Sequence, residues 1–461
     1  MIVSPAFAGQ HYAVLGLARS GLASVATLLA SGAQVTAWDN REEPRTLLAA
    51  RFPAAHQADL LTIDLSGFDG IVVSPGVPLN HHPIAAAAAA AGVPIIGDIE
   101  LFALARSALP AHRVVGITGT NGKSTTTALV HHLLKSAALP VRMGGNIGLP
   151  VLEQEPLVPN DRGAGVYVLE LSSYQIDLTH NLACEVAALL NITPDHLDRY
   201  DGFGHYAASK ARLFAMQRAT DHAVFGVGDA ETAAVAAREE ARRGSAYVHR
   251  ADGRELADLQ PLWPTLAGPH NLQNAAAAVA IVSALGLTPA QWRPAMATFR
   301  GLPHRMERVA EAGGVLYIND SKATNPASAA PALAAFPPAP ERRIHWICGG
   351  LPKGGDLDEC APFFGNVAAA YVIGDAGPLF AEILAPSMPV NRSEMLCDAL
   401  RQAMAAAHPG DIVMLSPACA SFDQFRDYEA RGDSFRQIVE ALIAEGPNVS
   451  NTFCADQGAS L

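Results

Sequence analysis

The sequence is poor in charge, and most of all in positive charge. Charged residues make up 16% of the 461 residues, and 32 lysines and arginines stand against 44 aspartates and glutamates. The formal net charge of −12 argues against a broad basic surface of the kind that binds nucleic acid or an anionic membrane. Positive charge for an anionic ligand must therefore be concentrated locally.

Cysteine and long hydrophobic runs are also scarce. The six cysteines show neither a C-x-x-C pair nor a zinc-finger spacing, which favours free thiols in a reducing compartment. The most apolar run, residues 84–91, reads as a short alanine-rich helix that cannot span a bilayer. The first ten residues lack the basic and apolar regions of a signal peptide. We expect a cytoplasmic monomer that neither inserts into a membrane nor binds nucleic acid.

Residues 114–127 contain the most informative pattern in the chain, a buried strand that breaks into a glycine-rich turn and then a helix. Glycines at 116, 119 and 122 allow main-chain N–H groups to converge on an anion, and Lys123 and Ser124 add a charge and a hydroxyl that can bind a metal. The standard phosphate loop has glycine six residues before the lysine, where this chain has Ile117. We interpret the turn as a variant loop for a nucleotide polyphosphate.

The length suggests about three domains. Strand-like and helix-like stretches alternate along residues 1–107, 108–302 and 303–461. This alternation predicts an α/β fold with an N-terminal Rossmann-like domain, a central phosphate-loop ATPase domain with a mostly parallel sheet, and a C-terminal Rossmann-like domain. The polar residues 446–461 are expected to form a flexible tail.

The first segment resembles a dinucleotide-binding βαβ unit. Residues 12–16 and 34–39 read as strands on either side of a helix at 21–31, and the turn 16–21 has Ala18 where the dinucleotide fingerprint has glycine. Asp39 ends the second strand, where an acid that contacts a nucleoside is expected. A further strand, 70–74, runs into Pro75 and Gly76 and can line the same crevice. A nucleotide site and a purely structural Rossmann-like unit both fit this pattern.

Two polar side chains follow apolar strands of the central segment. Glu170 lies near the end of the predicted strand at 165–171, and His196 follows the predicted strand at 186–192. Because ligand crevices open at the carboxyl ends of parallel strands, both are candidates for a metal or an active site. Asn271 and Asn274 are three residues apart at the start of a helix and therefore share a face, where they could contact adenine or phosphate oxygens.

The third segment places three polar loops after predicted strands, at residues 319–326, 349–355 and 415–423. Together they would form a positively charged pocket that is rich in hydroxyl groups and suits a small carboxylate. The sequence offers no base at a spacing that would activate Cys419, so we expect this residue in the core or behind the residues that contact the ligand.

Several of these motifs together resemble the Mur ligases. They are residues 118–124, 170–175, 191–199, 268–274, 304–305 and 319–325. Within that family, the 16–21 turn with Asp39, residues 144–148 and residues 416–425 are most similar to the member that adds glutamate. The resemblance spans the chain.

The resemblance implies a three-domain enzyme that uses ATP and two Mg²⁺ ions. It would join D-glutamate to UDP-N-acetylmuramoyl-L-alanine through an acyl phosphate. The implied ATP contacts are Gly119, Thr120, Asn121, Gly122, Lys123, Ser124, Thr125, Asn271, Asn274, Arg305 and Asp320. The implied UDP-substrate contacts are Gly16, Leu17, Ala18, Arg19, Ser20, Asp39, Asn40, Arg41, Ser74, Pro75, Gly76 and Asn146.

The resemblance also assigns the reacting and metal-binding groups. The implied D-glutamate contacts are Thr324, Lys353, Ser421 and Tyr428. The implied metal ligands are Ser124, Glu170, His196 and Lys210, the last as an N-carbamate. The implied catalytic residues are Lys123, Asn146, His196, Lys210 and Lys322.

Three other functions remain to be weighed. A glutamate-adding ligase of the same superfamily could act on another acceptor, such as a folate, although the N-terminal unit with Asp39 favours a UDP-sugar. A nicotinamide-dependent oxidoreductase built on the first segment would leave residues 123–127 unexplained. A non-catalytic nucleotide-binding scaffold would leave the predicted magnesium ligands idle.

Overall fold

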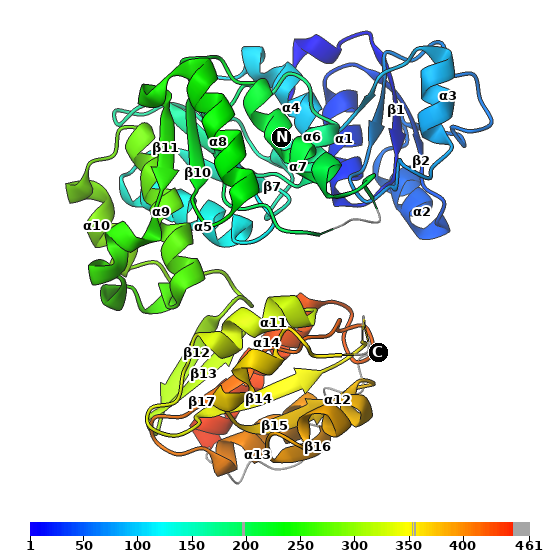
Figure 1. Ribbon diagram of the computed structural model, residues 1–461. Helices are drawn as coiled ribbons and strands as arrows, with labels where there is room; N and C mark the ends of the chain where they lie inside the picture. Colours follow the sequence, from blue (N-terminus) through cyan, green and yellow to red (C-terminus); the bar gives the residue numbers. More distant parts are fainter. Residues whose placement is uncertain (196–198, 353, 355, 446–461) are drawn as a thin grey trace. The chain divides into compact units, whose positions relative to one another are not determined.

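Three sheets with flanking helices make up the fold (Figure 1). The computed structural model describes residues 1–195, 199–352, 354 and 356–445. Internal contacts divide the chain into two compact units, one with residues 1–260 and 271–298 and the other with residues 261–270 and 299 onward. The predicted α/β fold with mostly parallel sheets is confirmed.

The N-terminal sheet is parallel, with the strand order β3-β2-β1-β4-β5. Its strands are β1 (His11–Leu15), β2 (Gln34–Trp38), β3 (His56–Gln57), β4 (Gly70–Val73) and β5 (Ile95–Ile96). Its helices are α1 (Arg19–Ala30), α2 (Glu42–Arg51), α3 (Ile84–Ala91) and α4 (Asp98–Ala105). Strand β4 is buried throughout, as is typical of a parallel sheet covered on both faces.

The central sheet is also parallel, with the order β11-β10-β9-β6-β8-β7. Its strands are β6 (His112–Thr118), β7 (Val141–Gly145), β8 (Gly165–Glu170), β9 (Val186–Leu189), β10 (His222–Gly226) and β11 (Val248–Ala251). The helices are α5 (Lys123–Ser136), α6 (Ser173–Asp177), α7 (Phe203–Ala215), α8 (Ala230–Arg243), α9 (Pro269–Ala284) and α10 (Pro289–Ala297). The sequence predicted neither β7 nor β11, because both are short edge strands with polar residues.

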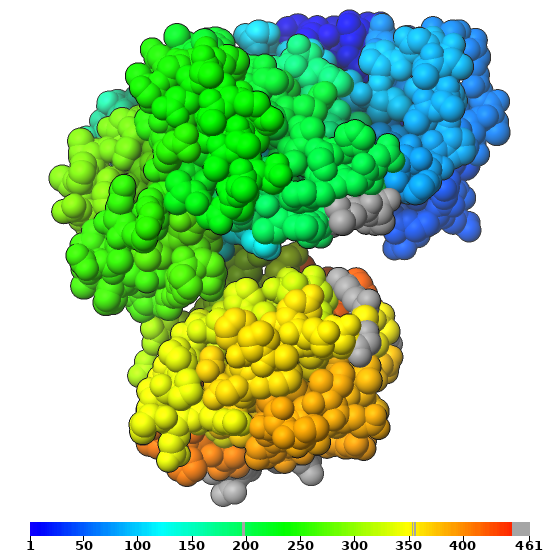
Figure 2. Space-filling view, in the orientation of Figure 1, coloured from blue at the N-terminus to red at the C-terminus, as the bar shows by residue number. Residues whose placement is uncertain are grey.

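One hydrophobic core joins the first two sheets. The face of β1 that carries Tyr12 and Val14 packs with α1 and α4, and the same cluster continues into Tyr167 and Leu169 of β8. The opposite face of β1 packs with α3 in a separate cluster. The N-terminal and central segments accordingly form one continuous surface, coloured blue to green in Figure 2.

The C-terminal sheet has the order β12-β13-β17-β14-β15-β16, and only β12 is antiparallel. Its strands are β12 (Glu307–Ala312), β13 (Val315–Asn319), β14 (Ile344–Gly349), β15 (Val367–Ile373), β16 (Val390–Glu394) and β17 (Ile412–Leu415). Helices α11 (Pro326–Ala334) and α12 (Gly377–Leu384) pack on one face, and α13 (Leu396–Ala406) and α14 (Tyr428–Glu445) pack on the other. The sequence did not predict β12 or β16, which are polar edge strands.

Two expectations from composition can be compared with this fold. Cys184, Cys348, Cys360 and Cys419 are buried free thiols, as expected. Cys397 is disulfide-bonded, so the expectation of free thiols is wrong at that position. Within the described ranges, every helix is too short or too polar to cross a membrane.

Asp98 should make the stability of the first unit depend on pH. It is 3% exposed, and its Oδ1 atom has no hydrogen-bond partner among the described residues. Burial raises the pKa of Asp98 to about 6, above its value in an unfolded chain. A carboxyl with a raised folded-state pKa costs stability once it ionises, so stability falls as the pH rises from about 4 through 6.

We therefore expect Asp98→Asn to stabilise the protein at pH 8 by about 2–3 kcal/mol more than at pH 4. Urea denaturation of both forms at the two pH values measures this difference. The exposed Asp161→Asn serves as the control and should show no such pH dependence. An equal effect of Asp98→Asn at both pH values would refute the assignment.

Candidate active site

The glycine-rich turn between β6 and α5 has the geometry of an anion-binding loop. Gly119 and Gly122 have φ angles of 153° and 83°, and a Cβ atom on Gly122 would lie 2.1 Å from Asn274 Oδ1. Glycine is therefore required there, and helix α5 begins directly afterwards at Lys123. The Lys123 Nζ atom donates to the carbonyl oxygens of Gly119 (2.9 Å) and Thr120 (2.7 Å), which holds the ammonium group at the loop.

Asparagine side chains from two other elements support this loop. Asn191, just after β9, accepts from the Asn121 N–H (2.8 Å) and donates to the Asn121 carbonyl (3.1 Å). Asn274 of α9 lies against Gly122, and its Nδ2 atom donates to Asn271 Oδ1 (3.3 Å). The prediction that both amides of α9 share a face is confirmed, and that face borders the loop.

Lys210 of α7 lies beneath the same loop. It is 2% exposed, its Nζ atom donates to the Gly119 carbonyl (3.0 Å), and the ammonium group lies 4.6 Å from the ring centre of Tyr206. Tyr206 also makes a 3.1 Å hydrogen bond to the Thr120 hydroxyl. Burial, together with the neighbouring charge of Lys123, lowers the pKa of Lys210 to about 7. A large fraction of this amine is therefore neutral near physiological pH.

Glu170 provides a carboxylate next to the loop. Strands β6 and β8 place Glu170 opposite Ile117, two residues before the loop begins at Gly119. Its Oε1 atom accepts from Asn146 Nδ2 (3.1 Å), whereas its buried Oε2 atom has no hydrogen-bond partner among the described residues. The partly unsatisfied Glu170 carboxylate and the buried Ser124 hydroxyl of α5 are oxygen ligands of the kind that a hard divalent cation prefers. Among the described residues, no three His, Cys, Asp or Glu side chains form a metal-binding group.

The turn after β1 is closely packed. Gly16 has a φ of 87°, and its carbonyl accepts from the Ser74 hydroxyl (2.8 Å) at the end of β4. A Cβ atom on Gly21 would lie 1.9 Å from the Gly16 carbonyl oxygen, so helix α1 approaches the turn as closely as glycine allows. Ala18 is the N-cap of α1 and makes no side-chain cap bond.

Asp39 forms hydrogen bonds within the protein itself. Its carboxylate accepts from the Leu17 N–H (2.8 Å) and the Arg41 N–H (3.0 Å). Burial alone would raise the pKa of Asp39, but these hydrogen bonds and the Arg41 guanidinium lower it below its ordinary value. Asp39 therefore remains an anion that fixes the turn between the first two strands.

Two arginines connect the N-terminal segment to the central segment. Arg19 at the start of α1 donates to the Gly148 carbonyl (2.9 Å), two residues after Asn146. Arg199 donates to the carbonyls of Pro75 (3.3 Å) and Gly76 (3.4 Å) and lies 4.5 Å above the ring of Tyr174. The predicted UDP contacts at residues 16–20, 39–41, 74–76 and 146 thus lie within one unit.

The second unit gathers its polar residues after β13 and β17. Asp320 accepts from the Ser416 hydroxyl (2.8 Å) and the Met306 N–H (3.1 Å), while burial raises the pKa of Asp320 to about 7. The Lys322 ammonium lies 3.7 Å from the ring centre of Tyr428, at the start of α14. The Ser321 hydroxyl donates to the Tyr428 carbonyl (2.8 Å), which brings the β13 loop and α14 together.

The remaining predicted site residues lie in several helices and loops of both units. Thr125 lies in the first turn of α5, and Arg305 lies in the turn before β12. Thr324 and the buried Ser421 lie in the loops after β13 and β17. His196 and Lys353 lie outside the described residues. Sequence reasoning missed Tyr206 and Arg431, both buried and both bonded to predicted site loops.

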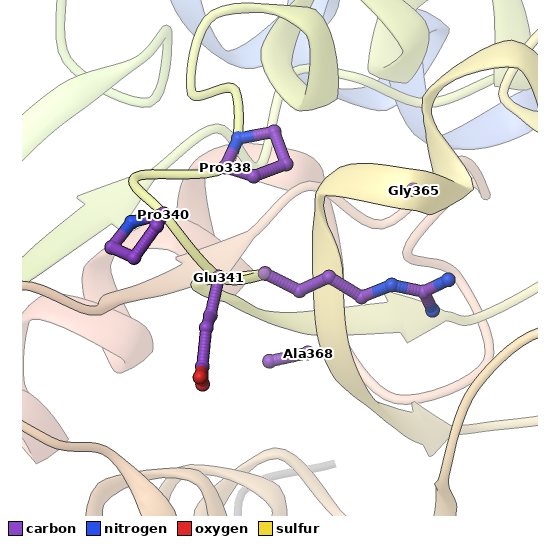
Figure 3. A pocket seen from close by; sticks show the side chains of 6 residues that line it. Pro338, Pro340, Glu341, Gly365 and Ala368 are labelled. Carbon is purple, nitrogen blue, oxygen red and sulfur yellow. The ribbon is translucent and has the colours of Figure 1, made fainter.

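Two hollows of the second unit lie away from these loops. One, of about 570 Å³, is lined by residues at the amino ends of β14 and β15, among them Pro338, Glu341 and Gly365 (Figure 3). The other, of about 750 Å³, borders Gly313 and Val315 at the start of β13. Both are at the amino ends of the strands, whereas the polar loops follow the carboxyl ends, so neither hollow is the candidate site.

Family models match all three parts of the chain. Residues 10–97 match the "Mur ligase MurD-like, N-terminal domain", residues 117–282 the "Mur ligase middle domain", and residues 304–419 the "Mur ligase, glutamate ligase domain".

Curated relatives resemble the chain over almost its entire length. The UDP-N-acetylmuramoylalanine–D-glutamate ligase of Novosphingobium aromaticivorans is 69% identical, over 96% of this chain and 98% of the relative. The proteins of the same name from Sphingopyxis alaskensis and Zymomonas mobilis are 60% and 52% identical, each over 96% of this chain and 100% of the relative.

Solved structures show the same fold at low identity. The UDP-N-acetylmuramate-alanine ligase of Thermotoga maritima superposes with a TM-score of 0.56 at 18% identity, over 94% of this chain and 99% of that one. A MurF ligase from the same organism, in complex with ADP, gives a TM-score of 0.54 at 15% identity, over 95% and 96% of the two chains.

Proposed function

Because this chain belongs to the Mur ligase family, we propose that it catalyses the ATP-dependent addition of D-glutamate to UDP-N-acetylmuramoyl-L-alanine. The observation that carries this function is the 69% identity to a ligase of that name over 96% of the chain. The phosphate loop, the N-terminal turn and the loops of the second unit offer separate groups for the three substrates.

The reaction has two steps. The alanyl carboxylate of the UDP substrate attacks the γ-phosphorus of ATP, which forms an acyl phosphate and releases ADP. The amine of D-glutamate then attacks the acyl carbon, loses a proton, and the tetrahedral intermediate collapses to an amide and inorganic phosphate. A carboxylate is a poor acyl donor in water, so positioned cations and dipoles must stabilise the charge that develops on the transferring phosphoryl group.

In the first unit, the loop residues 119–125 hold the phosphates of ATP. The Lys123 ammonium exchanges its main-chain acceptors for phosphate oxygens, and the N–H groups at the start of α5 point toward the same anion. Asn271 and Asn274 border the loop and contribute amide groups to the nucleotide. Asn146 is bonded to Glu170, and Arg19 of the N-terminal segment donates to Gly148, two residues further on; these contacts support a role for Asn146 in orienting the reacting carboxylate.

Magnesium fits the carboxylate and hydroxyl groups beside the loop. Glu170 and Ser124 would hold one ion, and His196 with the Lys210 carbamate would support a second. Bound Mg²⁺ supplies charge neutralisation for the triphosphate during phosphoryl transfer.

In the second unit, the loops after β13 and β17 bind D-glutamate. Lys322 provides a cation for a substrate carboxylate, and the hydroxyls of Thr324 and Ser421 provide donors. Tyr428 holds the Lys322 side chain through its ring, and Lys353 completes the predicted contacts. For ATP, the predicted roles are the ribose for Asp320 and the γ-phosphate for Arg305.

The proposal also covers the domain boundaries, the cellular location and the oligomeric state of the enzyme. The boundaries are 1–107, 108–302 and 303–461, so that each domain contains one of the three sheets. We expect the enzyme to act as a monomer in the cytoplasm, where ATP and UDP-linked sugars are made.

The substrate assignment is tested by ADP release. ADP formation should require UDP-N-acetylmuramoyl-L-alanine, and amide formation should require D-glutamate. Assays with L-glutamate and with a folate as acceptor provide the comparison arms. Turnover only with L-glutamate, or with a folate, would show that the chain is a different glutamate-adding ligase.

Carbon dioxide should activate the enzyme through Lys210. Its neutral amine is available near pH 7, and the addition of CO₂ with loss of a proton makes a carbamate anion there. Removal of dissolved CO₂ at pH 8 is expected to lower kcat about tenfold or more, since a carbamate that supports a metal is lost. Added bicarbonate should restore the rate.

Lys210→Arg is the control for this prediction, because arginine keeps the charge but forms no carbamate. Its low activity should not respond to bicarbonate. A wild-type enzyme that is equally active with and without CO₂ would contradict the carbamate.

A further inference from the structure

Arg431 is a buried cation in the first turn of α14 that sequence reasoning overlooked. It is 1% exposed, and none of the described carboxylates is within salt-bridge distance of it. Burial lowers the pKa of Arg431 to about 10, and Asp423 opposes this effect from a distance, so the guanidinium remains charged at neutral pH. Burying a charge without a counterion is costly and calls for a structural or functional reason.

The guanidinium bonds to two different strand-end loops. Its Nε atom donates to the Ser321 hydroxyl (3.0 Å) and Nη2 to the Ser321 carbonyl (2.9 Å), both in the loop after β13. Nη2 and Nη1 also donate to the carbonyls of Cys419 (3.0 Å) and Ala420 (3.1 Å), in the loop after β17. One planar group therefore fixes the spacing of both loops.

A third loop packs against the same side chain. A Cβ atom on Gly350 would lie 3.0 Å from Arg431 Nη1, and Leu351 forms a main-chain bridge to Ala420. Residues directly adjoining these bonds are the proposed D-glutamate contacts: Lys322 follows Ser321, and Ser421 follows Ala420. Tyr428, which supports Lys322, is three residues before Arg431 on the same helix.

We propose that Arg431 is a positioning residue for the amino-acid substrate. Its five-donor fork sets the distance between Lys322 and Ser421, and its unneutralised charge adds to the positive potential that attracts a dicarboxylate. This role rests on the proposed D-glutamate site. Small displacements of groups that orient a substrate lower the reaction rate strongly. Loss of the Arg431 guanidinium should therefore impair the use of the amino-acid substrate more than that of the other two substrates.

The test compares the three KM values of Arg431→Met and Arg431→Lys with those of the wild type. Arg431→Met should raise KM for D-glutamate roughly 10- to 100-fold and leave those for ATP and the UDP substrate within about twofold. Arg431→Lys keeps the charge but loses the fork, so its effect on KM for D-glutamate should be smaller. Millimolar guanidinium should partly restore the KM of Arg431→Ala.

Arg243→Met is the matched control. The Arg243 side chain is buried, forms an ion pair with Glu239 and donates to the Asp221 carbonyl (2.7 Å), but it lies on α8 in the first unit. It should lower the melting temperature without a selective change in KM for D-glutamate. If Arg431→Met and Arg431→Lys leave KM for D-glutamate unchanged, or raise all three KM values together, the proposal is overturned.

An incorrect assignment of the D-glutamate ligase function would give a different result from an incorrect role for Arg431. A wild-type enzyme that does not use D-glutamate would refute the proposed function before any variant is made. If Arg431→Met does not fold, Arg431→Lys decides the question, because a normal KM for D-glutamate in that variant shows that the fork has no positioning role.

Discussion

Replacing Lys123 with alanine will lower kcat by about 10³-fold or more, which corresponds to about 4 kcal/mol of transition-state stabilisation. Lys123 begins α5, and its ammonium is held at the glycine-rich turn by two loop carbonyls. Alanine removes the positive charge from the place where the transferring phosphoryl group gains negative charge. The other groups of the loop, its N–H donors, remain in place.

The fold should tolerate this change. The Lys123 side chain makes hydrogen bonds to carbonyls of its own turn and is only partly buried. The melting temperature of Lys123→Ala should therefore stay within about 3 °C of the wild type. Steady-state ADP release and thermal melting, measured on the same sample, test both parts.

Lys135→Ala is the matched control, since Lys135 is exposed in the last turn of the same helix. It should retain wild-type kcat. A Lys123→Ala enzyme with kcat within tenfold of the wild type would show that the loop does not act on the transferring phosphoryl group.

Glu170→Gln is expected to lower kcat by about 10²- to 10³-fold and to raise the Mg²⁺ concentration for half-maximal activity about tenfold. Glutamine keeps the shape of the side chain and can still accept from Asn146 Nδ2. It replaces the unsatisfied Oε2 atom with an amide NH₂, which cannot ligate a cation. A lower kcat in Glu170→Gln would therefore reflect the loss of metal binding and not a change in side-chain packing.

Magnesium titration of ADP release and Mn²⁺ binding followed by electron paramagnetic resonance measure this effect. Glu153→Gln, at an exposed position before the 165–170 strand, is the control and should behave as the wild type. An unchanged Mg²⁺ dependence in Glu170→Gln would remove Glu170 from the proposed metal site.

The core of the candidate site was predictable because its signals are local. A strand, a glycine-rich turn and a helix that starts on lysine follow one another along the sequence. Strand β8 ends at Glu170, one residue before the predicted end of the strand at residue 171. The two amides of α9 share a face because helical geometry places residues i and i+3 together. Each of these predictions depends only on residues that are close together in the sequence and on the regular geometry of a helix or a strand.

The elements and residue roles that the sequence did not predict depend on contacts between distant segments of the chain. Strand β12 reads Glu-Arg-Val-Ala-Glu-Ala, which favours a helix by composition, and only pairing with β13 makes it a strand. Arg431 looks like a surface residue until the loops after β13 and β17 enclose it. Asp39 was predicted as a nucleoside contact, and its second task, to hold the turn at Leu17, appears only when the strands pair.

The hydrophobic cluster that runs from α1 and α4 into β8 has a consequence for modularity. Residues such as Tyr12 and Phe102 would be exposed to water if the N-terminal segment were separated from the central one, so the two should melt as a single cooperative unit. If the N-terminal segment is exchanged between family members, the new segment must therefore fit the part of this cluster that the central segment contributes.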